Sequence, residues 1–319
     1  MKLGLAGSGM IVNELFKFIR EVPEIELCAI GSTARSYEKV REIAKRENIP
    51  HAYETAADMI RSDTIDTVYL GIPNSLHYEY AMMSIENGKN LIIEKPFMMS
   101  CAEAGSVFEA AEKKDLMVFE AIPLRYQTTY EKLRETLPKL GDIKLVTLNY
   151  SQFSSRYDLF QKGILRPNFD RKLGGGSLND LGIYNLHLTA GMFGLPLSAK
   201  YYPNIERDVD TSGVLVLDYG EFKATLTNAK DTDAPGFINV IGGNKGRITF
   251  RAPNNSLDEF EYTLYDGTRG SFKRTPEHRM LPEFRAIEKA IREHDTDEYI
   301  KRKAETLEVM KVLDLAHHY

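Results

Sequence analysis

The 319-residue chain contains no tryptophan, only two cysteines and no long block of one charge sign. Cys28 and Cys101 have neither metal-ligand nor redox spacing and fall in predicted buried elements, so a reducing, cytoplasmic compartment fits best. The net charge of −5 and the pI near 5.9 give no basic excess, which argues against nucleic acid or an anionic membrane as partner. No group of histidine and acidic residues has metal-ligand spacing, so we expect no bound metal.

Hydrophobic runs suited to a membrane are also missing. Residues 1–12 imitate a signal peptide, but Glu14 and Lys17 follow at once. Residues 181–199 carry no charge, yet polar residues, a proline and three glycines make the stretch a poor membrane span. We therefore expect a soluble chain without a targeting segment.

The first 120 residues alternate between strand and helix patterns. Strands are predicted at 2–6, 27–30, 67–70, 91–93 and 116–119, with helices at 11–19, 36–46, 79–87 and 102–114. This alternation is typical of an α/β Rossmann domain with a doubly wound parallel sheet.

A glycine-rich turn follows the first strand. Gly7 permits a tight turn, and Gly9 lets the backbone approach a pyrophosphate at the start of the next helix. Val12 stands where a third glycine is usual, so the motif alone is weak. With the alternating pattern it predicts a dinucleotide site, to which we assign Gly7, Ser8, Gly9, Met10 and Ile11.

The end of the second strand bears on which dinucleotide binds. An acidic residue there would bind the ribose hydroxyls of NAD, whereas hydroxyls and a guanidinium suit the additional phosphate of NADP. This chain has Ser32, Thr33 and Arg35, and no acid before Glu38. We therefore favour NADP over NAD. The alternative is that Arg35 lies on a solvated helix start.

The pattern changes after residue 121. A connecting helix is predicted at 122–137, strands at 144–152, 214–218, 222–228, 237–241, 247–250 and 260–264, and helices at 282–293 and 300–317. Successive strands predict a C-terminal α+β domain with a large, mostly antiparallel open sheet. We expect a dinucleotide-binding domain at 1–121 and a substrate-binding and oligomerisation domain at 122–319. The open sheet face would form a homodimer or homotetramer.

Lys95 lies where a predicted strand ends. The apolar residues 91–93 read as a buried strand, and Pro96 prevents its continuation. Open α/β sheets bind their ligands at this edge. Lys95 is therefore a candidate active-site cation.

A second candidate segment begins with Gly174, Gly175 and Gly176. Ser177 could cap a helix on which Asp180, Tyr184 and His187 share one face. A carboxylate, a phenol and an imidazole could then act together. Alternatively, Asp180 stabilises the helix N-terminus while Tyr184 and His187 pack beneath the sheet.

Together these motifs resemble the Gfo/Idh/MocA family, which includes glucose–fructose oxidoreductase and inositol dehydrogenase. The resemblance covers nearly the whole chain and depends on four segments: Gly7-Ser8-Gly9, Pro73-Asn74-Ser75-Leu76-His77, Glu94-Lys95-Pro96, and residues 174–184. It implies that Lys95 and Asp180 line the active site and that Tyr184 holds the third catalytic position. Tyrosine there is similar to the branch with xylose dehydrogenase and dimeric dihydrodiol dehydrogenase, whose members commonly use NADP.

The resemblance also implies other binding residues. Pro73, Asn74, His77, Glu94 and Lys95 would contact the cofactor. For His77 a structural role is the other favoured reading, and a catalytic role is the alternative to both. Arg125 and Tyr126 keep the first part of a family segment that borders the substrate pocket, but the following proline is absent. His187 would contact substrate or pack inside the domain.

The implied reaction is reversible hydride transfer between nicotinamide and a CH–OH carbon of a sugar, polyol or cyclic diol. The alcohol proton requires a base. A free phenol titrates near about pH 10, and a nearby ammonium favours the phenolate, so Tyr184 beside Lys95 is the first candidate. Lys95 itself is the competing base. Asp180 would orient the substrate hydroxyls or the lysine.

Two other functions stay open at this point. Some relatives bind NAD(P) as non-enzymatic regulators, and biliverdin reductase-like enzymes share the architecture. Regulators can lose the lysine, whereas this chain keeps Lys95, Asp180 and Tyr184. The retained residues favour an enzyme.

Overall fold

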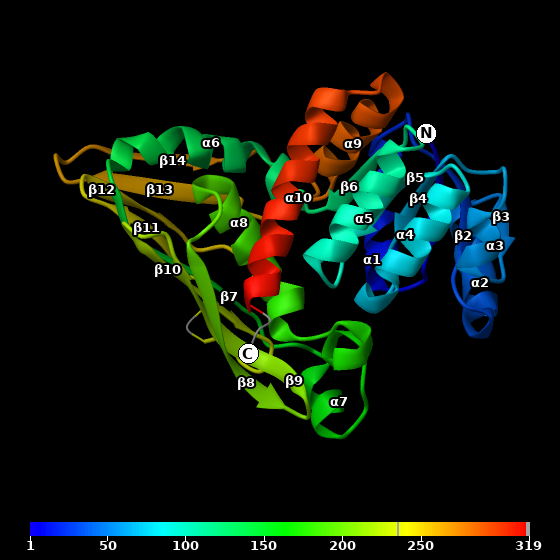
Figure 1. Cartoon of the computed structure of the whole chain (residues 1–319), viewed down its shortest axis with the longest axis horizontal. Coiled ribbons are helices and arrows are strands. Elements are labelled where there is room, and N and C mark those ends of the chain that lie inside the picture. Colours follow the sequence, from blue (N-terminus) through cyan, green and yellow to red (C-terminus); the bar gives the residue numbers. More distant parts are fainter. Residues whose placement is uncertain (235, 317–319) are drawn as a thin grey trace. The chain divides into compact units, whose positions relative to one another are not determined.

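The computed structural model describes residues 1–234 and 236–316 (Figure 1). The chain forms two compact units. The first comprises Met1–Ala121 and Met280–Leu307, and the second comprises Ile122–Arg279 with residues 308–316. The first boundary coincides with the predicted one, but residues 280–307 lie with the first unit and not with the second.

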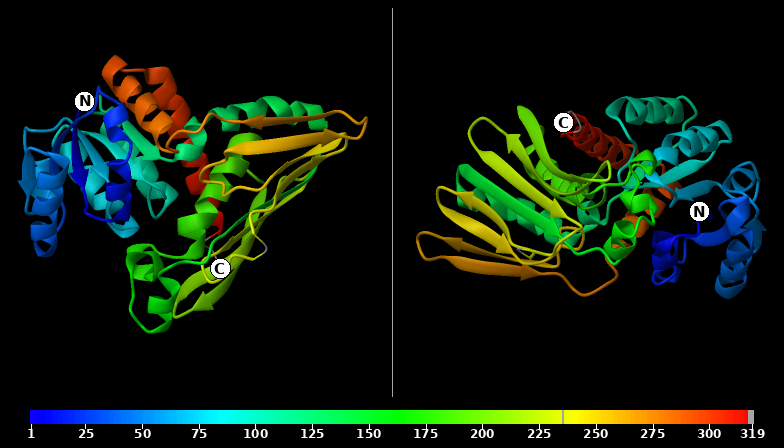
Figure 2. Two further views of the ribbon diagram at one scale, coloured as in Figure 1. Left: turned by 180° about the vertical axis from the view of Figure 1, so that it is seen from behind. Right: turned by 90° about the horizontal axis from the view of Figure 1, so that it is seen from below.

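The first unit is built on a parallel sheet of six strands in the order β3-β2-β1-β4-β5-β6. Helices flank both of its faces (Figures 1 and 2). The strands are β1 (Lys2–Ala6), β2 (Glu26–Gly31), β3 (His51–Tyr53), β4 (Thr67–Leu70), β5 (Asn90–Glu94) and β6 (Val118–Ala121). The helices are α1 (Met10–Leu15), α2 (Tyr37–Glu47), α3 (Ala56–Ile60), α4 (His77–Glu86) and α5 (Cys101–Glu112). The strand order reverses between β1 and β4, where ligands of such sheets bind.

Residues 280–307 join the first unit through aromatic and polar contacts. They comprise α9 (Leu281–Glu293) and the first part of α10 (Thr296–Ala316). The ring of Phe284 lies 5.8 Å from that of Tyr69, and Tyr299 lies 5.8 Å from Phe119. The residues in these contacts are 215 and 180 positions apart in the chain, a separation that local periodicity does not reveal.

The second unit contains a sheet of eight strands in the order β14-β13-β12-β11-β7-β10-β9-β8, drawn as one layer in Figure 2. Among the described strands of this sheet only β7 and β10 pair in parallel, so the predicted mostly antiparallel sheet is confirmed. The strands are β7 (Ile143–Ser151), β8 (Ser198–Glu206), β9 (Val209–Asp218), β10 (Lys223–Ala229), β11 (Asn239–Gly243), β12 (Gly246–Phe250), β13 (Glu259–Leu264) and β14 (Arg269–Lys273).

Helices α6 (Thr128–Thr136) and α8 (Ile183–Phe193) lie on one face of this sheet (Figures 1 and 2), and α7 (Tyr157–Gln161) precedes α8. Asn185 fixes α8 to the sheet because its amide donates to Thr227 O at 2.9 Å. On the opposite face, Leu145, Tyr202 and Val214 are 62%, 54% and 37% exposed. The strand registers place these three side chains on the same side.

Some elements were not predicted from the sequence. These are β3, α3, α7, β8 and β14. The predicted helix at 122–137 is a 3₁₀ turn at Pro123–Tyr126 followed by α6. His317, the last residue of the predicted final helix, lies outside the described residues.

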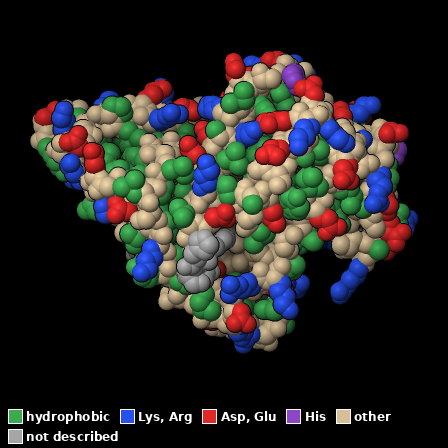
Figure 3. All heavy atoms as spheres, in the orientation of Figure 1, with side chains coloured by type: hydrophobic (Ala, Val, Ile, Leu, Met, Phe, Trp, Pro, Cys, Tyr) green, Lys and Arg blue, Asp and Glu red, His purple; other side chains and the backbone are tan. Residues whose placement is uncertain are grey.

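Two observations describe the surface charges and the apolar character of the helices. Acidic and basic side chains are interspersed over the face drawn in Figure 3. Within residues 1–234 and 236–316, no helix combines the length and apolar character needed to cross a membrane.

Candidate active site

The two glycines of the turn after β1, Gly7 and Gly9, have different roles. Gly7 has φ +117°, donates its N–H to Gly31 O at 2.8 Å, and would collide with Gly71 O if it carried a Cβ. Gly9 has φ −80°, and a Cβ there would meet no atom within 4 Å. Gly7 is therefore required by the fold, whereas Gly9 leaves open space beside the turn that a dinucleotide could fill.

The missing third glycine has a structural counterpart. Val12 is fully buried, and a Cβ at Gly71 would lie 2.9 Å from Val12 Cγ2. Gly71 follows β4, the neighbour of β1. The glycine needed for close packing of α1 is therefore supplied by the adjacent strand end and not by α1 itself.

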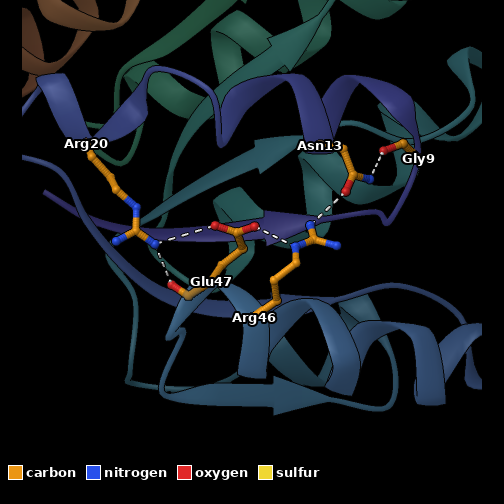
Figure 4. Close-up of polar contacts among 5 residues, drawn as sticks. All are labelled: Gly9, Asn13, Arg20, Arg46 and Glu47. Carbon is orange, nitrogen blue, oxygen red and sulfur yellow. Dashed lines mark hydrogen bonds and ion pairs between the residues drawn. The ribbon is translucent and has the colours of Figure 1, made fainter.

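A chain of polar contacts fixes the glycine turn to α2 (Figure 4). Asn13 Nδ2 donates to Gly9 O at 2.7 Å, and Arg46 donates to Asn13 Oδ1 at 3.0 Å. Glu47 accepts from Arg46 at 2.7 Å, and Arg20 donates to Glu47 O at 3.0 Å. The backbone at Gly9 is thus held in place from the far end of α2.

The segment after β2 carries hydroxyls and cations. Thr33 Oγ1 and Ser36 Oγ lie 3.1 Å apart, and Arg35 is exposed. Lys39, which the sequence argument missed, donates from Nζ to Ser8 O at 2.5 Å. Its signal was a second basic residue one helical turn after Arg35. These groups suit an anionic ribose substituent beside the glycine turn.

Lys95 follows β5 at the carboxyl edge of the sheet, as predicted, and is half-buried. The Lys95–Pro96 peptide bond is cis. The preceding Glu94 is buried and accepts a hydrogen bond from Tyr69 Oη at 2.6 Å. The hydrogen bond therefore joins the end of β5 to β4. Contact between Glu94 and the cofactor remains a prediction.

Two buried side chains hold the turn that contains Lys95. His77 Nδ1 lies 3.1 Å from Pro96 O, and Nε2 lies 3.2 Å from Ile72 O. Glu120 accepts from Phe97 N at 3.1 Å. Burial lowers the pKa of His77, which favours the neutral ring. These contacts give His77 a positioning role. Cofactor binding by His77, Pro73 and Asn74 remains a prediction.

Asp180 lies in a π-helical turn, Leu178–Gly182, that leads into α8. Lys230 directly follows β10, and its Nζ is 2.8 Å from Asp180 Oδ2. The predicted single α-helix from Ser177 is therefore wrong in its first turn. π-turns are frequent at functional sites because they shift side chains out of α-helical register.

The π-turn is supported from below by a polar network. Asp210 accepts from Leu178 N at 2.7 Å and from Tyr201 Oη at 2.8 Å, and burial raises its pKa. Gly176, with φ +127°, leaves the space that Asp210 fills. Ser177 accepts from Asn228 at 2.9 Å and makes no cap hydrogen bond, so the predicted cap is wrong.

Tyr184 and His187 are both buried on α8. The Tyr184 ring lies 5.6 Å from that of Tyr150 on β7, at an angle of 50°. Packing thus fixes the phenol ring against the sheet, which agrees with the alternative reading of this helix. The catalytic assignment of Tyr184 and the substrate assignment of His187 remain predictions.

Arg125 is a buried partner of α8. Its Nη1 donates to Tyr130 Oη at 2.6 Å, and Gly191 leaves room for both side chains. Tyr126 is half-buried beside it. The contacts of Arg125 favour a positioning role, and substrate binding by Arg125 and Tyr126 stays a prediction.

Known proteins similar to this chain identify its class. Residues 1–122 match the model of an oxidoreductase family with an NAD-binding Rossmann fold. The chain is 31% identical over 232 residues to scyllo-inositol 2-dehydrogenase (NADP(+)) IolU of Bacillus subtilis, covering 72% of this chain and 70% of that one. It is 28% identical over 254 residues to trans-1,2-dihydrobenzene-1,2-diol dehydrogenase of Xenopus tropicalis, covering 77% and 74%.

A solved structure supports the fold. KijD10, a 3-ketoreductase from Actinomadura kijaniata in complex with NADP and TDP-benzene, superposes with a TM-score of 0.86 at 18% identity, over 99% of this chain and 96% of that one. Among the described residues, no group of three or more histidine, cysteine or acidic side chains could hold a metal. The chain belongs to the Gfo/Idh/MocA oxidoreductase family with its NAD-binding Rossmann fold.

Proposed function

We propose that the protein is an NADP-preferring dehydrogenase that transfers hydride between nicotinamide and a CH–OH carbon of a cyclic polyol, with sugars and cyclic diols as related substrates. The observation that carries the proposal is Lys95, a half-buried cation at the ligand-binding edge of a dinucleotide-type sheet. The turn that follows it is held by His77 at Pro96 O and by Glu120 at Phe97 N. The similarity to scyllo-inositol and dihydrodiol dehydrogenases supports the substrate class.

The cofactor residues belong to the first unit. The open side of Gly9 would accept the pyrophosphate, and Arg35 and Lys39 would meet the 2′-phosphate of NADP. When bound, the nicotinamide supplies a hydride acceptor or donor. The dinucleotide role of this unit and the substrate and oligomerisation role of the second unit are part of the proposal.

The proton must be handled by the chain itself. Lys95 stabilises the substrate oxygen as the C–H bond breaks, and Tyr184 or Lys95 takes the hydroxyl proton. Asp180 orients a neighbouring hydroxyl.

The test is turnover of NADP and NAD with scyllo-inositol, other inositols, aldoses and the trans-dihydrodiol, followed by NADPH or NADH absorbance. Lys95→Ala should lower kcat by at least about 10³-fold. Lys89→Ala is the matched control, because Lys89 directly precedes β5 and lies at the amino edge of the sheet. Its Nζ donates to Ser62 O and Ile65 O at 2.9 and 2.8 Å. A Lys95→Ala enzyme near the wild-type rate contradicts the proposal.

A non-enzymatic NADP-binding regulator is the second candidate. It is favoured only by the burial of Tyr184 and His187, which suits packing as well as catalysis. The same assay separates the two functions, because a regulator would bind NADPH, seen as enhanced fluorescence, without turning over any of these compounds.

We also propose a dimer through the open face of the second sheet. Leu145, Tyr202 and Val214 expose apolar surface there, and a second copy would cover it. Val214→Glu should give monomers by light scattering. The two cysteines form no disulfide in the described part of the chain, which supports a cytoplasmic enzyme.

A further inference from the structure

Lys230 is a buried lysine to which none of the sequence motifs assigns a role. It follows the last residue of β10, and its side chain is 2% exposed. Nζ lies 2.8 Å from Oδ2 of Asp180, whose own side chain is 33% exposed. The pair therefore joins an interior cation to a carboxylate that reaches the surface of the unit.

The lysine is fixed from several directions. Nζ also donates to Asn168 O and lies 4.2 Å from the centre of the Phe169 ring. Its main-chain N–H donates to Thr211 O at 2.8 Å. A buried ammonium is costly unless it is paired and hydrogen-bonded. Asp180 is paired with this cation at 2.8 Å, and Lys230 also acts electrostatically on the buried carboxyl group of Asp210.

The carboxylate is fixed in turn. Its π-turn is held by Asp210 through Leu178 N, and Lys230 holds its side chain. We propose that Lys230 is a positioning residue, which sets the direction and the negative charge of Asp180 toward a substrate hydroxyl. This inference rests on the proposed function, in which Asp180 orients the substrate. Outer partners of this kind typically change activity by about 10- to 100-fold.

The experiment compares Lys230→Met with wild type. We expect kcat/KM for the polyol to fall by about 10- to 100-fold with a raised KM. The NADPH dissociation constant should stay within about twofold, because Lys230 belongs to the second unit. Lys223→Met is the matched control, since Lys223 begins the same strand and pairs at 2.7 Å with Asp218 on the surface. It should leave kcat/KM unchanged.

Two further measurements distinguish positioning from packing. Propylammonium should restore activity to Lys230→Ala, which leaves a space for it, and not to Lys230→Met, which fills that space. In the Asp180→Asn background, Lys230→Met should lower kcat/KM for the polyol little further, because both changes remove the same interaction. Additive losses, or no rescue by propylammonium, overturn the inference. If Lys230→Met fails to fold, Lys230→Gln replaces it in the comparison with Asp180→Asn.

Failure of the proposed function would look different. The wild type would then bind NADPH but oxidise none of the compounds. In that case a crystal structure of Lys230→Met tests the positioning role of Lys230. The inference expects the Asp180 carboxylate to turn away from its wild-type direction in this variant. A carboxylate in the original position overturns it.

Discussion

The two glycines of the first turn should respond differently to alanine. At Gly7, alanine must adopt a left-handed backbone, at about 1 to 2 kcal/mol, and its Cβ meets the carbonyl of Gly71, so the backbone must shift. At Gly9 the backbone is extended and the Cβ meets nothing, so stability should change by less than about 0.5 kcal/mol. A dinucleotide lying against Gly9 would be displaced by the added methyl group.

Thermal unfolding and NADPH titration separate these effects. Each kcal/mol lowers Tm by about 2 to 4 °C in a unit of this size, so Gly7→Ala should melt at least about 2 °C lower. Gly9→Ala should melt like wild type but bind NADPH at least about tenfold more weakly, equivalent to about 1.4 kcal/mol. Wild-type NADPH affinity in Gly9→Ala would refute the assignment of the pyrophosphate to this turn, and an unchanged Tm in Gly7→Ala would refute the steric argument.

Three other predictions concern specificity, packing and pH. Arg35→Ser combined with Lys39→Met should weaken NADPH at least about tenfold and leave NADH within about twofold, measured by fluorescence titration. Gly191→Ala should lower the free energy of unfolding in urea by about 1 to 3 kcal/mol, because a Cβ there collides with Arg125 and its hydrogen-bonded tyrosine. Burial lowers the pKa of His77, so its contribution to stability is present above about pH 6.5 and is lost as the pH falls below that value. The stability of His77→Gln should therefore decline less than that of wild type between about pH 7 and 5, and equal slopes in urea unfolding would contradict this.

The sequence predicted what local patterns determine. Alternating strands and helices gave the parallel sheet, and the position of Pro96 placed Lys95 at its carboxyl edge. The turn between β1 and α1 followed from Gly7, whose positive φ few other residues adopt. In each case the signal and the structure lie within a few residues of one another.

The parts that were missed depend on distant segments. Lys39 contacts Ser8 from 31 positions away, and Lys230 contacts Asp180 from 50 positions away. The π-turn was read as α-helix because its five residues carry no propensity signal of their own. Asp210 stabilises that turn from β9, through Leu178 N.

In each unit, a buried carboxylate accepts a main-chain N–H close to a residue that we propose for the active site. Glu120 accepts the N–H of Phe97, two residues after Lys95, and Asp210 accepts the N–H of Leu178, two residues before Asp180. Both carboxylates are buried, and burial raises the pKa of Asp210, so ionising it in the interior costs free energy. Apolar residues would fill these positions at less cost, but they would leave the two main-chain donors without acceptors. The buried carboxylates are therefore best explained by the rigid backbone they impose beside Lys95 and Asp180. A fixed main chain is what the proposed roles of these two residues require, since a side chain that meets a substrate must be placed within a fraction of an ångström.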